Sequence, residues 1–185
     1  LDLHNFVWIR TPILLDEIPP EECDASCPRT IGYWKNNVKK TLEGRTRGVQ
    51  ETPESIEAGL RFVARNSGFY CSGMDVTDPV LMDPCNPLTL EEANVILQRN
   101  QKSYPGGKDQ ANSMLARALQ QNLASWLNWG SGKVCDNTGV VLTVADGTFE
   151  GTLWDALQEA QDIILNGGNL ERAKDIGDQI NNGNL

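Results

Sequence analysis

The chain has a single histidine, His4, among its 185 residues. A serine or cysteine nucleophile activated by histidine would therefore need the N-terminal end of the chain to reach its site. The motifs His-Glu-x-x-His and Cys-x-x-Cys-His are missing, and so is a glycine-rich phosphate loop after a strand. A hydrolase built on two carboxylates stays open, but the 25 acidic residues would supply such pairs in any fold. The sequence therefore favours a protein that is not an enzyme.

Long apolar runs and an excess of positive charge are missing as well. No run approaches the roughly 20 apolar residues that span a bilayer, so we expect no membrane insertion. With 16 basic against 25 acidic residues, the formal net charge is −9, which repels phosphate backbones. We therefore expect no nucleic-acid partner, and we interpret the basic residues near the N-terminal third as a solvated face: Lys35, Lys39, Lys40, Arg45 and Arg47.

Acidic side chains can collect divalent cations, but the sequence shows no calcium loop. Asp75, Asp78 and Asp83 lie in a segment with proline and lack the alternating acidic spacing that ends in glycine. We predict no cofactor and leave calcium open as a ligand.

The beginning of the chain bears on its location. It starts at Leu1 rather than Met, and a charged segment followed by an apolar one is missing. We therefore expect that an export signal has been removed and that the protein is secreted, either free outside the cell or at its surface.

Five cysteines fit this location, because exported proteins keep their cysteines in disulfides worth roughly 2 to 4 kcal/mol each. The candidates are Cys23, Cys27, Cys71, Cys85 and Cys135. Cys71 and Cys85 flank a segment rich in Gly, Asp and Pro, where a disulfide would replace missing secondary structure. The odd cysteine is either buried or bonded to a neighbouring subunit. A four-thiolate zinc site of Cys23, Cys27, Cys71 and Cys85 is the alternative in a reducing compartment, with irregular spacing.

Residues 1–22 predict an extended segment that ends in Pro19-Pro20. The segment is too apolar to remain in water. It packs either on its own domain as an edge strand or on the next subunit by strand addition. The possible assembly contacts are Phe6, Val7, Trp8, Ile9, Ile13, Leu14 and Leu15.

Residues 23–185 predict a compact, mainly α domain stapled by disulfides. Helix starts are indicated at Thr52 with Pro53, at the capping box of Thr89 and Glu92, at Thr152 with Asp155 and at Asn169. The second helix should run to about residue 100, and Asp109 should cap the longest helix. Residues 139–144 predict a strand, and Asp146-Gly147 turns it into a small hairpin.

One segment carries a rare signature, made of Cys27, Thr30, Gly32, Tyr33, Trp34, Lys35 and Asn36. It resembles the Cys-x-x-Thr-x-Gly-Tyr-Trp-Lys-Asn-His opening of a family of uncharacterised secreted modules of bacteria and archaea. The resemblance extends to about Gly183 and implies an exported helical module without a known activity. Asn37-Val38 replaces the usual His-Pro, and a C-terminal cysteine common in the family is missing, which leaves the partner of Cys27 open.

Two interpretations of this motif compete. In the first, Tyr33 and Trp34 bury their rings with polar partners, Gly32 permits close backbone approach, and the stem of Lys35 covers apolar surface. In the second, Tyr33, Trp34 and Asn36 form a patch that stacks on a sugar. We favour the first.

Together these features predict an extracellular structural protein that assembles with copies of itself, as a subunit of a filament or surface layer joined through its N-terminal segment. The first alternative is a monomeric module that binds a surface glycan or protein through Tyr33 and Trp34. The second is a hydrolase.

Overall fold

A computed structural model describes residues 28–134 and 139–185. The N-terminal segment of residues 1–22 and the cysteines Cys23, Cys27 and Cys135 lie outside the described residues. The predicted mainly α fold is confirmed. Its elements are α1 (Ile31–Leu42), α2 (Pro53–Ser67), α3 (Leu90–Gln98), α4 (Gly107–Ala111), α5 (Met114–Gly130), β1 (Gly139–Val144), β2 (Gly147–Thr152), α6 (Leu153–Asn166) and α7 (Leu170–Asn181).

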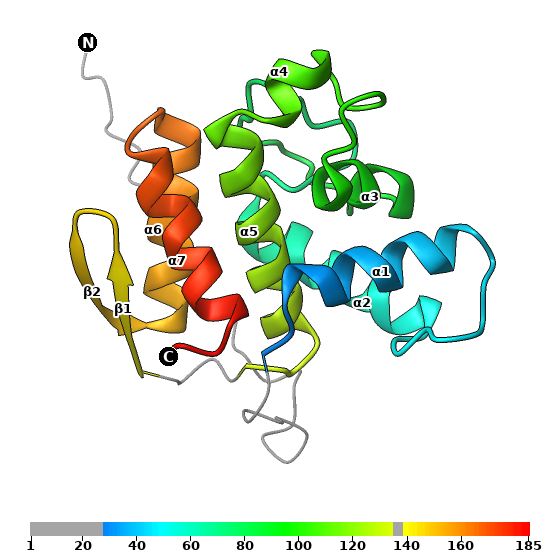
Figure 1. Cartoon of the computed structure of the whole chain (residues 1–185), viewed down its shortest axis with the longest axis horizontal. Coiled ribbons are helices and arrows are strands. Elements are labelled where there is room, and N and C mark those ends of the chain that lie inside the picture. Colours follow the sequence, from blue (N-terminus) through cyan, green and yellow to red (C-terminus); the bar gives the residue numbers. More distant parts are fainter. Residues whose placement is uncertain (1–27, 135–138) are drawn as a thin grey trace, which may run out of the picture.

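Helix α5 forms the centre of the molecule. Figure 1 shows α6 and α7 on one side of it and α1 and α2 on the other, with α3 and α4 near its N-terminal end. Every residue from 118 to 129 is buried, including five polar ones. A helix surrounded on all sides cannot turn polar side chains to water, so these side chains depend on partners within the protein. Four of them have such partners, namely Gln120, Gln121, Ser125 and Asn128, whereas the Asn122 amide has none among the described residues.

The capping residues read from the sequence start the helices as predicted. Thr52, Thr89, Thr152 and Asn169 each accept a hydrogen bond from a backbone N–H in the first turn, and capping boxes form at Thr89 and Thr152. The helix from Thr89 ends at Gln98, close to the predicted end, where Arg99 adopts a left-handed conformation with φ of 46°.

The predicted cap of the longest helix is wrong. Asp109 lies inside the short helix α4, which ends at Ala111. Ser113 is the true cap, because its extended backbone lets its Oγ accept from the N–H of Ala116 at 3.1 Å. The chain therefore changes direction between the two helices, which the continuous apolar pattern concealed.

The predicted hairpin is confirmed. β1 and β2 pair antiparallel, with Val144 opposite Gly147 next to the turn and Val141 opposite Glu150. Alternate residues of β1 are buried, so the hairpin covers the helices with one face and leaves the other in solvent.

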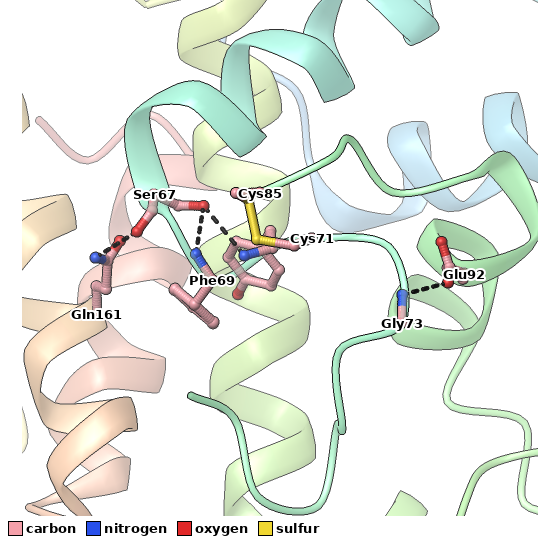
Figure 2. The surroundings of a disulfide bond; sticks show 8 residues. Ser67, Phe69, Cys71, Gly73, Cys85, Glu92 and Gln161 are labelled. Carbon is pink, nitrogen blue, oxygen red and sulfur yellow. Dashed lines mark hydrogen bonds between the residues drawn. A yellow bond between two sulfur atoms is a disulfide. The ribbon is translucent and has the colours of Figure 1, made fainter. Parts of the chain in front are cut away.

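The segment between α2 and α3 has no helix, and the predicted disulfide is found there. Cys71 bonds to Cys85, with Cα atoms 5.0 Å apart (Figure 2). At one side Gln161 donates to the carbonyl of Ser67 at 2.7 Å, and at the other Glu92 accepts from the N–H of Gly73 at 2.7 Å. This bond also rules out the four-thiolate zinc site, because two of its thiolates are joined to each other.

Candidate functional site

The signature motif forms the start of α1 and is anchored in the core. The Oγ1 of Thr30 accepts from the N–H of Tyr33 and so caps the helix. Trp34 is only 1% exposed, and its Nε1 donates to the Oδ1 of Asn128 on α5 at 3.0 Å. The ring therefore has a polar partner and no free face for a ligand.

Tyr33 lies at the edge of the core beside Glu51, a buried acidic side chain that is 8% exposed. The Tyr33 hydroxyl donates a short hydrogen bond to one carboxylate oxygen of Glu51, and Ser55 donates to the other at 2.6 Å. The ammonium of Lys133 lies 3.5 Å from the same carboxylate, and the Arg29 guanidinium stacks over the Tyr33 ring at 5.3 Å. This Glu51 cluster joins α1, α2 and the loop after α5.

Competing effects set the protonation states of Glu51 and Tyr33. Burial favours the neutral form of Glu51, but the hydrogen bonds from Ser55 and Tyr33 and the charge of Lys133 outweigh it, so the pKa of Glu51 lies below its ordinary value. Burial together with the Glu51 carboxylate raises the pKa of the Tyr33 hydroxyl. Tyr33 therefore stays protonated and acts as a hydrogen-bond donor.

The amide that serves the motif is Asn37 rather than Asn36. Its Oδ1 accepts from the N–H of Gln50 at 2.7 Å and of Glu51 at 3.2 Å, and its Nδ2 donates to the carbonyl of Tyr33. Asn36 is exposed. The helical period could have found this residue, because Asn37 follows Trp34 by three positions and so lies on the buried face.

The remaining motif residues among the described ones are Lys35 and Gly32. The carbonyl of Lys35 accepts from Gln98 on α3 at 3.0 Å. Gly32 is exposed, and a Cβ built on it would meet only the Oγ1 of Thr30, at 3.6 Å. The expected close backbone approach at Gly32 is therefore wrong for the described residues.

Sequence reasoning missed a buried network of amides between α5 and α7. Asn128 accepts from the N–H of Arg29, and its Nδ2 donates to the carbonyl of Arg29 at 2.8 Å and to the Oδ1 of Asn181 at 2.9 Å. Asn181 in turn donates to the carbonyl and to the side chain of Gln121. Ser125 adds a bond to Asn181 at 3.2 Å. The network ties the start of the motif helix to the end of the chain.

Large apolar side chains in the described residues are exposed away from the motif. They are Val80, Leu81, Val141 and Trp154. Trp154 is 38% exposed and rests at right angles against Trp126 and Trp129, which are buried. These exposed apolar side chains lie on the disulfide loop, the hairpin and the start of α6.

The described residues hold no group of three or more His, Cys, Asp or Glu side chains arranged to bind a metal. Asp75, one of the acidic residues considered for calcium, accepts hydrogen bonds from the backbone and side chain of Thr77. Within the described ranges, none of the helices combines the length and the apolar character that crossing a membrane requires.

Comparison of the chain with protein-family models, with curated proteins and with solved structures found no match. The resemblance to secreted bacterial and archaeal modules therefore stays a prediction.

Proposed function

We propose that the protein is an extracellular structural subunit that assembles with copies of itself through residues 1–22. The burial of Trp34 carries the choice between the two main alternatives. A motif that stacks on a glycan needs an exposed ring face, whereas a motif that organises a fold needs buried rings with polar partners. Trp34 has the second set of properties.

The Cys71–Cys85 bond supports the location, because such bonds persist mainly outside the cytosol. The N-terminal segment supports assembly, because burying its apolar residues away from water is favourable. Each copy would then offer one segment to a neighbour, and contacts of this head-to-tail kind build filaments unless they close into rings.

Assembly is testable with the full chain by light scattering and electron microscopy. We expect polymers from the parent chain and monomers from the Ile9→Asp variant, because the aspartate would carry a charge into an apolar contact. The matched control is Asn5→Asp, which adds the same charge at a polar position of the segment and should still polymerise. A parent chain that stays monomeric at high concentration would overturn the proposal.

A further inference from the structure

The hairpin β1–β2 offers an unpaired edge. Among the described residues, neither strand forms backbone hydrogen bonds outside the hairpin. Figure 1 shows β1 between β2 and helix α7, which leaves β2 as the outer strand. In an antiparallel pair, the N–H and C=O groups of alternate residues point away from the partner strand. Since Val144 and Gly147 flank a two-residue turn, Thr148 and Glu150 present these groups on the outer edge of β2.

This edge is held in a fixed position. Val140, Leu142 and Phe149 are buried on the inner face of the hairpin. At the turn, Asp146 accepts from Arg172 of α7 at 2.6 Å, and Arg172 also bonds to Glu159 of α6. Because this edge is already ordered, only the incoming strand loses conformational entropy when the two pair.

The edge also has little of the usual protection against pairing. Proteins shield open edges with lysine, proline or bulges, and β2 contains neither lysine nor proline and pairs with β1 residue for residue. Its one charged residue is Glu150, and Val141 opposite Glu150 is 63% exposed on the outer face. The outer face therefore combines an apolar contact with a carboxylate.

We propose that the β2 edge of one copy accepts residues 5–11 of a neighbouring copy as a third strand. This inference rests on the proposed function and names the surface that receives the segment. The segment alternates so that Phe6, Trp8 and Arg10 share one face of a strand, and Val7 and Ile9 share the other. The face with Arg10 would lie beside Val141 and Glu150, where the Arg10 guanidinium can pair with the Glu150 carboxylate. The face with Val7 and Ile9 would extend the apolar inner face beside Phe149.

Length and reach agree with this pairing. The strand of residues 5–11 is about as long as β2, and Pro12 ends it because proline has no N–H to donate. Residues 12–27 can span up to about 50 Å when extended. A domain of this size has a radius of gyration of about 15 Å, so the strand reaches a neighbouring copy. Pro19 and Pro20 favour extended backbone in the connecting segment.

The test places proline on either edge of the hairpin in the full chain. Glu150→Pro removes an outward N–H from β2, and Thr143→Pro does the same on the opposite edge of β1, so neither breaks a bond within the hairpin. We expect Glu150→Pro to remain folded by circular dichroism but monomeric by light scattering, while Thr143→Pro forms polymers. Polymers from Glu150→Pro would overturn the β2 edge as acceptor and leave self-assembly intact. A monomeric parent chain would overturn both.

A charge exchange keeps the test decisive if a proline variant fails to fold. Glu150→Arg and Arg10→Glu should each raise the critical concentration for assembly about two- to fivefold, because each places like charges across a strand pair. In an equimolar mixture, the two variants can alternate, and every junction between unlike variants then pairs opposite charges. The mixture should therefore assemble near the concentration of the parent chain. A mixture no better than the separate variants would contradict the pairing of residues 5–11 with β2.

Discussion

Glu51 shows how a single side chain holds distant parts of this chain together. Its carboxylate accepts hydrogen bonds from Tyr33 of α1 and Ser55 of α2, and it forms an ion pair with Lys133 in the loop after α5. A carboxylate removed from water is costly unless it is hydrogen-bonded and paired, and here both conditions are met. The motif residue Tyr33 thus contributes to the fold through a partner that lies outside the motif.

We predict that Glu51→Gln destabilises the protein in a pH-dependent way. The pKa of Glu51 is lower in the folded chain than in the unfolded chain. Its contribution is therefore fully present above the unfolded pKa of about 4.3 and is lost as pH falls through the lower folded value. At neutral pH the variant should lose about 1 to 3 kcal/mol of unfolding free energy, and the difference should shrink below about pH 4. Urea unfolding between pH 3 and 7 measures both.

The control for this prediction is Glu57→Gln. Glu57 is exposed and lies 3.9 Å from Arg61 in a surface ion pair, which contributes little. The unfolding free energy of the Glu57→Gln variant should change with pH as that of the parent chain does. A constant difference between Glu51→Gln and the parent across the whole pH range would show that the charge of Glu51 does not contribute.

At the scale of elements, the close packing of α5 against α7 depends on a glycine in the middle of a helix. A Cβ built on Gly177 would lie 2.8 Å from the Cβ of Gln121 and 2.9 Å from its backbone carbon. The backbones therefore approach more closely than any other residue would permit. This contact places Gln121 and Ser125 within reach of Asn181 in the buried network.

We predict opposite effects for two glycine-to-alanine changes in helices. Gly177→Ala should cost about 1 to 3 kcal/mol, because α5 and α7 must separate. Gly32→Ala meets only an ordinary contact at 3.6 Å and should be neutral or stabilise by up to about 1 kcal/mol. Urea unfolding of both variants measures the contrast. A destabilising Gly32→Ala would mean that Gly32 is needed for a contact beyond the described residues.

Elements were predictable from the sequence where local chemistry sets them. The capping boxes at Thr89 and Thr152 and the turn at Asp146-Gly147 act within a few residues, so the sequence shows them. The start of α5 was missed because Asp109 and Ser113 are both good caps, and only the change in chain direction selects between them. Asn128 and Asn181 were missed because their bond joins residues far apart in the sequence, and an amide on a helix shows no sign of its partner.

At the scale of the whole molecule, two non-helical segments pack on the helical core and leave one side in solvent. The hairpin is fastened by Arg172 at its turn, and the loop between α2 and α3 is fastened by Cys71–Cys85. Both carry exposed apolar residues, Val141 on one and Val80 with Leu81 on the other. If the protein assembles as proposed, a neighbouring copy could cover these residues. The disulfide holds the loop that carries Val80 and Leu81.

We predict that the double variant Cys71→Ser with Cys85→Ser loses about 2 to 3 kcal/mol of unfolding free energy, because opening a loop of this length releases chain entropy in the unfolded state. The two cysteines are 14 residues apart. Apart from their bond, a few backbone hydrogen bonds, such as that from Ser72 to Asn86, and the Glu92 carboxylate hold the loop. Limited proteolysis should then cut between residues 72 and 84 while the helical circular dichroism remains. Reductant added to the double variant reports separately on the remaining cysteines. If the double variant matches the parent in both measurements, the domain does not depend on this disulfide, and its support for an oxidising compartment is lost.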